Sequence, residues 1–251
     1  MRSPITKTID WFFGRGEFGV TVPAMDGALR PNDALDRSTV LLQERDIDNV
    51  TSCGGRLFFS SHTSLFQVGA AGTPASKMKD FGQPITAMAA SPAGTLAVAL
   101  ANGQVLFIDG GVERQYLSPQ KAGLTCITAM CFAGEKSLLI CNGATDISAD
   151  RWVHDLMSLG CSGSLWRLDC SDATMSRLAN GLAWPAGVIE RNGKIFVSEA
   201  WRHRIVEIGA GRPRNVLTDL PGYPARMVQS KAGTLLCVFA PPLAADRVRI
   251  A

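Results

Sequence analysis

The sequence predicts an all-β fold, a β-propeller with about five recognisable four-stranded blades. Three observations support this class: one turn-and-strand pattern recurs five times, further strand-like runs flank each copy, and helical periodicity is absent over any long stretch. Propeller blades are four-stranded antiparallel sheets that recur every ~40 residues. A β-sandwich can match this density of strands, but it does not repeat one internal pattern at a fixed period.

The repeated pattern is a turn, a polar or small residue, and a short β-rich apolar run. The first apolar residues of successive copies are 39, 42, 57 and 40 positions apart. The longest spacing contains an insertion at 143–160, which predicts a loop followed by a short helix with Ser148 or Asp150 at its N-terminus. The five copies are GGRLFFSS (54–61), AGTLAVAL (93–100), EKSLLICN (135–142), NGKIFVSE (192–199) and AGTLLCVF (232–239).

Additional strand-like runs complete most of the predicted blades. A run precedes each copy and forms the innermost strand, a third strand follows four copies, and fourth strands are recognisable in three. Turns of Gly, Pro, Asn and Asp join them. The innermost runs are DNVTS (48–52), ITAMAA (85–90), ITAMCF (127–132), AGVIE (186–190) and RMVQS (226–230).

The two ends of the chain predict how the ring closes. The fifth unit is short after residue 239, so the N-terminal part (1–46) is expected to complete a blade, with EFGVTV (17–22) and STVLLQ (38–43) pairing with C-terminal strands. We expect one domain over 1–251. It is either a compact ring of about five blades or a six-bladed template with an incomplete C-terminal end, whose open edges favour self-association.

Composition narrows the function classes. Hydrophobic residues make up 46% of the 251 residues and charged residues 19%, with 25 Gly and 13 Pro, which excludes disordered and collagen-like chains. The net charge of +3 is dispersed and only two tyrosines are present, so we expect no nucleic-acid partner, which would need a basic stripe with stacking aromatics. No apolar run has the length of a membrane span or of a signal-peptide core, so no membrane insertion is expected.

The seven cysteines indicate a reducing compartment. They form no C-x-x-C pair, and most lie in apolar runs such as ITAMCF and SLLIC, where a buried thiol acts as a small hydrophobic side chain. We therefore expect a cytoplasmic protein with free thiols.

Candidate functional residues are expected where loops lead into the innermost strands, because these loops converge on the centre of a propeller. A hard-cation site needs several oxygen ligands, and only Asp48 and Asn49 supply them, so no metal and no other cofactor is expected. The positions predicted to meet at the centre are Asp48, Asn49, Thr86, Thr128, Pro185, Ala186, Ala225 and Arg226.

The segment EAWRHR (199–204) lies in the turn after its strand. We interpret Glu199 as the partner of Arg204 or Arg202 in an ion pair that fastens this turn. A functional role for His203 is the alternative.

The insertion contains two charged pairs at helical spacing. Asp150 and His154 are four positions apart, as are Arg151 and Asp155, so each pair would share one face of a helix. Surface ion pairing and packing of Trp152 explain this pattern. A His-Asp dyad is the alternative, but the sequence offers it no nucleophile, because neither a G-x-S-x-G elbow nor a P-loop occurs.

Four motifs follow one another between about residues 160 and 228: SGSLWRLD, LANGLAWPAGV, VSEAWRHRI and LPGYPARM. In this order they resemble the strictosidine synthase-like family of six-bladed propellers, which typically reads G-R-L-x-R-Y-D, G-L-x-F-x-N-G-V, V-A-E-x-x-x-x-R-I and L-P-G-Y-P-D-N. The ordered set is more specific than any single motif. Weaker similarity to the wider gluconolactonase and paraoxonase relatives extends through the earlier blades.

The resemblance implies a propeller that handles a small molecule at the mouth of its channel. Strictosidine synthase condenses an amine with an aldehyde by means of a glutamate on a later blade, to which no residue of this sequence corresponds. Lactonase and esterase relatives hold a calcium-type ion on Asn, Asp and Glu. Those positions fall here on Ile127-Thr128, Ala186-Gly187 and Ala225-Arg226, so the resemblance implies the scaffold without the ion ligands.

We therefore predict a strictosidine synthase-like propeller that acts on or binds a small organic molecule at the channel mouth. If it is an enzyme, amine-aldehyde condensation or lactonase- or esterase-type hydrolysis is expected, with no catalytic residue assigned. The alternative is a non-catalytic scaffold that binds a metabolite or a protein, because fold does not fix function. Arg226 favours an anionic or carbonyl-bearing ligand. The predicted ligand-binding residues are Asn49, Thr128, Asn142, Trp184 and Arg226.

Overall fold

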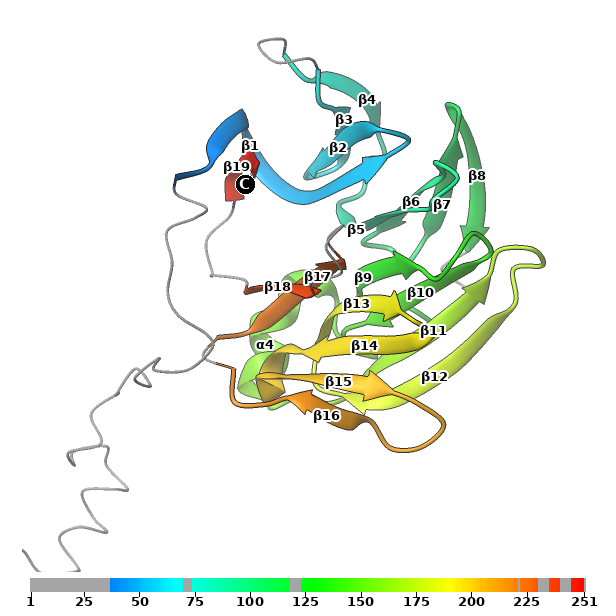
Figure 1. The fold of residues 1–251 in the computed structure, drawn as a ribbon, viewed down its shortest axis with the longest axis vertical. Coiled ribbons are helices and arrows are strands. Elements are labelled where there is room, and N and C mark those ends of the chain that lie inside the picture. The colour runs from blue at the N-terminus through cyan, green and yellow to red at the C-terminus, as the bar shows by residue number, and fades with distance from the viewer. Residues whose placement is uncertain are drawn as a thin grey trace, which may run out of the picture. The chain divides into compact units, whose positions relative to one another are not determined.

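Consecutive strands pair antiparallel, and Figure 1 shows the resulting sheets arranged around a common centre. The strands from Thr39 to Ile250 form one unit. The predicted all-β propeller is confirmed for the part of the chain that the computed structural model describes. That part comprises residues 37–69, 74–117, 123–220, 222–229, 235–239 and 245–250.

Five inner strands begin the five sheets. Consecutive members lie beside each other, β1 with β5, β5 with β9, β9 with β13 and β13 with β17. They contain the runs predicted as innermost strands, because each run combines β-branched or apolar residues with a turn on either side. Their bounds are β1 (Thr39–Cys53), β5 (Ile85–Ala90), β9 (Ile127–Phe132), β13 (Pro185–Arg191) and β17 (Pro224–Gln229).

The remaining strands extend each sheet outward in chain order, except β19, which pairs with β1 on the side opposite β2. Four sheets contain the four strands of a blade, and among the described residues β17 pairs with β18 alone. The strands are β2 (Arg56–Ser61), β3 (Ser64–Gln67), β4 (Ser76–Asp80), β6 (Leu96–Leu100), β7 (Val105–Asp109), β8 (Val112–Leu117), β10 (Ser137–Asn142), β11 (Gly163–Asp169), β12 (Met175–Leu182), β14 (Lys194–Glu199), β15 (Arg204–Ile208), β16 (Arg214–Leu217), β18 (Leu235–Phe239) and β19 (Ala245–Ile250).

The first sheet joins the two ends of the described chain. The first half of β1 pairs with β19, from Thr39 opposite Ile250 to Ile47 opposite Ala245. The second half of β1 pairs with β2. The prediction that STVLLQ pairs with a C-terminal strand is therefore confirmed, whereas EFGVTV lies outside the described residues.

The hydrophobic core lies between successive sheets. Every residue of β6 is buried, because its sheet packs against a neighbour on each face. One cluster joins the first and second sheets through residues such as Leu65 and Val98. The next joins the second and third sheets through residues such as Phe107 and Ile140. Burial between the sheets thus keeps the inner strands in place around the centre.

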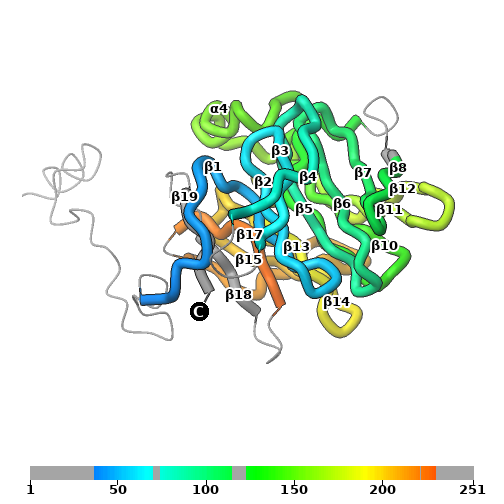
Figure 2. Tube along the Cα trace, turned by 90° about the horizontal axis from the view of Figure 1, so that it is seen from above, coloured from blue at the N-terminus to red at the C-terminus, as the bar shows by residue number. Residues whose placement is uncertain are grey.

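The insertion at 143–160 contains a 3-10 turn, η1 (Ala149–Arg151), followed by the helix α4 (Trp152–Met157). This confirms the predicted loop and short helix. Ser148 precedes η1, but its side chain makes no capping hydrogen bond. Figure 2 shows α4 beyond one end of the strands. Within the described residues, no helix has the length and apolar character needed to cross a membrane.

Candidate functional site

Each inner strand contains a β-bulge near the start of its pairing with the second strand of its sheet. In β1, Ile47 and Asn49 oppose consecutive residues of β2, so Asp48 between them is an extra residue. The other inner strands break register at the corresponding place. A bulge bends its strand and redirects a side chain, and bulges are frequent beside functional sites. The extra residues are Asp48, Thr86, Thr128, Ala186 and one of Ala225 and Arg226.

These bulges explain the predicted convergence at the centre. All eight positions predicted to meet there lie at a bulge or next to one. Sequence alone located the starts of the strands, but the extra residue is visible only from the pairing register. The bulges therefore define the candidate site as the level at which the five inner strands begin to pair with the second strands of their sheets.

Arg226 spans the centre at this level. Its Nη1 donates a hydrogen bond to the carbonyl oxygen of Asp48 at 2.8 Å, and its Nη2 donates one to the carbonyl oxygen of Thr86 at 2.7 Å. The Nη2 atom also lies 4.0 Å from Asp48 Oδ2. A side chain of the fifth sheet thus holds the first and second sheets, 178 and 140 residues away along the chain.

The guanidinium of Arg226 retains binding capacity. Desolvation by the surrounding protein lowers its pKa, but an arginine remains charged at neutral pH. A guanidinium has five N–H donors, and the two hydrogen bonds to carbonyl oxygens use two of them. Because 39% of the side chain is exposed, the remaining donors can serve a ligand.

Asn49 and Thr86 carry buried oxygen atoms without partners. Asn49 is 3% exposed, and its Nδ2 donates to Ser60 Oγ at 2.8 Å and to the Ile85 carbonyl at 3.2 Å. Asn49 Oδ1 and Thr86 Oγ1 have no hydrogen-bond partner. Buried polar atoms are nearly always satisfied in native proteins, so each of these two oxygens can accept a hydrogen bond from a small donor, water included, that reaches it.

Two other predicted ligand-binding residues hold backbone segments together. Thr128 Oγ1 donates to the carbonyl of Pro185, which links the third and fourth sheets. Asn142 is 2% exposed, with its Oδ1 accepting from the Cys126 amide at 2.9 Å and its Nδ2 donating to the Ala144 carbonyl at 2.7 Å. Their polar atoms are therefore engaged in the scaffold beside the site.

Trp184, the fifth predicted ligand-binding residue, belongs to an aromatic cluster. It is 8% exposed, and its ring stacks on that of Trp201, with centroids 5.2 Å apart. Tyr223 meets Trp201 edge to face at 5.6 Å, and His203 lies 4.7 Å from Tyr223. Ala186, a bulge residue, packs against the same cluster. The cluster thus extends from the bulge of β13 towards the start of β17.

The insertion is anchored to this cluster by Asp155. The side chain of Asp155 is buried, and its Oδ2 accepts a hydrogen bond from Trp201 Nε1 at 2.7 Å. Gly160 packs so closely against Asp155 that a Cβ atom there would lie 2.0 Å from Oδ1. The interpretation of Arg151 and Asp155 as a surface ion pair is therefore wrong, because the carboxylate turns inward to the indole. The ring centroid of Trp152 lies 6.3 Å from that of Trp201, although Trp152 is 38% exposed.

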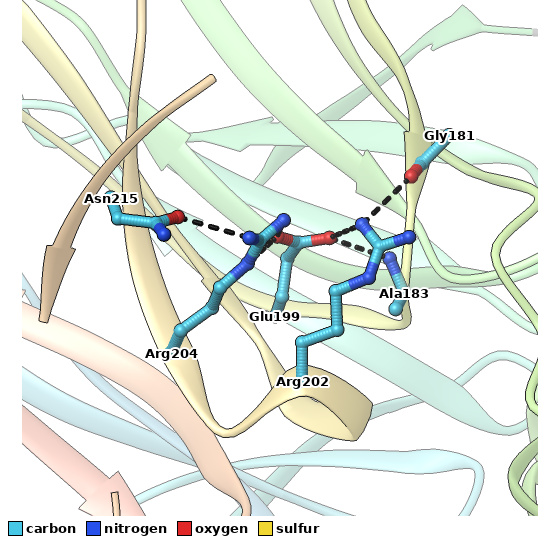
Figure 3. Close-up of polar contacts among 6 residues, drawn as sticks. All are labelled: Gly181, Ala183, Glu199, Arg202, Arg204 and Asn215. Atoms are coloured by element: carbon cyan, nitrogen blue, oxygen red, sulfur yellow. Dashed lines mark hydrogen bonds and ion pairs between the residues drawn. The ribbon is translucent and has the colours of Figure 1, made fainter. Parts of the chain in front are cut away.

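Glu199 forms the ion pair predicted for its turn and additional bonds (Figure 3). Its side chain is fully buried, with Oε1 accepting from Arg202 Nη1 and from the Ala183 amide, each at 2.8 Å. Arg204 Nε donates to Oε2 at 2.5 Å. Glu199 therefore pairs with both arginines and also fastens the loop before β13. His203, in the left-handed conformation, has Nδ1 3.2 Å from the Leu220 carbonyl.

The residues at the centre do not fit a calcium-type ion. Within the described part of the chain, no group of three or more His, Cys, Asp or Glu side chains could hold a metal. The carbonyl oxygens of Asp48 and Thr86, which are suitable cation ligands, accept hydrogen bonds from Arg226 instead. The guanidinium of Arg226, which these two carbonyl oxygens hold in place, therefore supplies the positive charge at the centre.

The fold is similar to that of solved propellers of different function. No protein-family model and no curated protein matches the sequence. A gluconolactonase from Xanthomonas campestris has a TM-score of 0.62 and 13% identity, over 79% of this chain and 71% of its own. Regucalcin, a calcium-binding protein from Agrobacterium tumefaciens, has a TM-score of 0.62 and 13% identity, over 85% and 76%.

A nidogen/laminin complex contains the same fold, with a TM-score of 0.60 and 13% identity, over 77% of this chain and 72% of that one. Likenesses at such low identity show the fold alone. The chain is thus a β-propeller of a type found in proteins of different function, and its own function has to be inferred from the centre.

Proposed function

We propose that this protein binds a small hydroxylated carboxylate or lactone at the centre, on the face where the inner strands begin. The observation that supports it most is the combination of Arg226 with the unpartnered oxygens of Asn49 and Thr86. The remaining N–H groups of Arg226 suit a carboxylate or carbonyl oxygen. The two oxygens suit hydroxyl donors of the same molecule.

Aromatic side chains beside the centre support the same class of ligand. Trp184, Trp201 and Tyr223 place ring surface next to the bulges, and Tyr223 is 38% exposed. Aromatic rings supply contact area together with a polar edge. A compact polyol acid or its lactone would combine contact with Tyr223 and polar bonds at Arg226.

Calorimetric titration with D-gluconate, glucono-1,5-lactone and glucose tests this proposal. We expect gluconate and the lactone to bind and glucose, which lacks the carboxylate or lactone carbonyl, to bind more weakly. Thr86→Val removes an unpartnered hydroxyl at constant shape, so the protein should remain as stable while gluconate affinity falls about tenfold. Arg167→Met, an exposed charge on β11 outside the centre, is the matched control. Equal binding by wild type and Thr86→Val would contradict the proposal.

Catalysis by this site is a separate question. The motif order supports strictosidine synthase-like amine-aldehyde condensation, and the name of the Xanthomonas relative supports lactone hydrolysis. Asp48, 61% exposed, is the carboxylate available at the centre. Lactone hydrolysis followed at constant pH, with Asp48→Asn as the variant and chelator-treated protein in parallel, would detect turnover. Binding without turnover in all of these assays supports the non-catalytic scaffold.

The remaining expectations concern location and assembly. We propose a cytoplasmic location, which the free thiols of the described chain support, including exposed Cys161. We also propose self-association through blade edges, which the exposure of all four residues of β16 supports. Sedimentation at several protein concentrations tests the second proposal, and a concentration-independent monomer would contradict it.

A further inference from the structure

We propose a second small-molecule site, between the first and second sheets, that takes a monocarboxylate with a compact aromatic or alkyl body. A cavity of about 340 Å³ lies there. Cavities of roughly 300 to 1,000 Å³ are typical of ligand sites. The inference is independent of the function proposed for the centre, because the two sites share no residue.

Three glycines at two turns create the room in this cavity. Gly94, Gly110 and Gly111 line it, and all three have positive φ. A Cβ atom on Gly110 or Gly111 would meet nothing within 4 Å. Larger residues with positive φ would be strained, so the backbone conformation of these turns keeps the wall free of side chains.

The floor of the cavity is apolar. Phe58, Leu65 and Leu96 line it and are 8%, 2% and 3% exposed. Cys53 also lines it, and burial raises the pKa of its thiol, which therefore behaves as a small apolar group. An engineered apolar cavity of about 150 Å³ holds one benzene. A volume of about twice that size accommodates a ring with a short alkyl chain.

Arg56 provides a positive charge beside this apolar floor. The other charged residues of the lining, Lys79 and Glu113, neutralise each other in an ion pair. Within the described residues, the side chain of Arg56 has no ion-pair or hydrogen-bond partner, and its guanidinium carbon lies 5.9 Å from the ring centroid of Phe58. The lining residues thus carry one net positive charge, which suits a single carboxylate.

The cavity between the second and third sheets provides an internal contrast. It measures about 260 Å³, and its charged lining residues are two acids and two bases. It therefore offers no net charge to an anion. Its charged residues are Asp109, Glu135, Arg114 and Lys136.

The proposed cavity is also remote from the centre. Asp48 lies at the bulge of β1, whereas Cys53 ends the same strand. Five residues of extended strand correspond to about 16 Å. A ligand in the cavity would therefore leave the signals of the bulge residues largely unchanged.

Amide NMR of the full chain with 3-phenylpropanoate tests the site. We expect the largest shifts at Gly94, Gly110 and Gly111, with saturation that yields a Kd. Arg56→Met keeps the aliphatic stem and should weaken binding about tenfold, because it removes a charge-assisted bond. Arg114→Met, in the neighbouring cavity, should leave the Kd unchanged.

The uncharged analogue 3-phenylpropanamide separates the contribution of the carboxylate charge from that of the apolar body. It should bind about tenfold more weakly than the carboxylate to wild type, and equally to wild type and Arg56→Met. Equal affinity of acid and amide for wild type would overturn the proposal. So would shifts centred on Gly143 or Gly187 near the bulges, or an unchanged Kd in Arg56→Met.

Discussion

Replacing Arg226 by methionine should destabilise the fold because it removes two bonds that join three sheets. Both bonds come from a charged donor to a carbonyl oxygen, at 2.8 and 2.7 Å. Hydrogen bonds of charged groups contribute roughly 1.5 to 3 kcal/mol each. Since 39% of the side chain is exposed, water replaces part of each bond, and the lower value applies. The expected loss is therefore about 3 kcal/mol.

The ion pair of Arg226 with Asp48 adds little to this sum. The two groups are 4.0 Å apart and the aspartate side chain is 61% exposed, and exposed pairs contribute between about zero and 1 kcal/mol. Arg226→Lys retains the charge, but its single ammonium has no planar fork for two carbonyl oxygens. We expect the lysine variant to lose about half as much stability as the methionine variant.

Urea unfolding by linear extrapolation measures these differences. The Tm of Arg226→Met should fall by about 6 to 12 °C, at roughly 2 to 4 °C per kcal/mol for a domain of this size. Arg167→Met, whose side chain is exposed on β11, is the control and should change stability by less than about 0.5 kcal/mol. A loss for Arg226→Met as small as that of the control would refute the reasoning. Full retention of stability in Arg226→Lys would refute the role of the fork.

Three further substitutions test the frame around the centre. Gly187→Ala should lower the free energy of unfolding by about 2 kcal/mol, because its Cβ would lie 2.3 Å from the Ala225 carbonyl oxygen. Gly209→Ala, with open space around it, should leave stability unchanged in the same urea unfolding experiment. Glu199→Gln should cost about 3 kcal/mol, because it leaves two arginines without their buried carboxylate, and an equal loss from a surface acid would contradict this. Burial raises the pKa of the Cys126 thiol from 9.0 to about 11. As pH rises from 9 to 11, the thiol therefore ionises in the unfolded chain before it does so in the folded protein, and the free energy of unfolding should fall. Cys126→Ala should make this fall smaller.

Local signals in the sequence were sufficient for the architecture. Turn residues and β-rich runs depend on neighbouring positions, so the five inner strands and their order followed from the repeat. The pairing of STVLLQ with a C-terminal strand also followed, because an open sheet edge needs a partner. The pairing of Glu199 with arginines was predictable since all three residues lie within one turn.

The parts of the site that depend on distant contacts were not predictable. Arg226 was recognised as a charge at the centre, but its bonds reach residues 178 and 140 positions away. The helical spacing of Arg151 and Asp155 is a local signal that predicts an ion pair, but the observed partner of Asp155 is Trp201, 46 residues away. The unpartnered oxygen of Thr86 depends on a bulge, which only the strand register defines.

The charge of Arg226 also determines what else the centre can hold. A divalent ion about 4 Å from Asp48 would gain about 8 kcal/mol at an effective dielectric constant of about 20, and about 5 Å from the guanidinium it would lose about 7 kcal/mol. The attraction to Asp48 is therefore nearly cancelled by the repulsion from Arg226, and it does not compensate for the hydration that the ion loses on binding. A neutral or anionic ligand meets no such repulsion and can bond to the N–H groups of Arg226 that the two carbonyl oxygens leave free. The residue that fastens the sheets thus disfavours a cation at the centre, which supports the proposed hydroxylated carbonyl ligand.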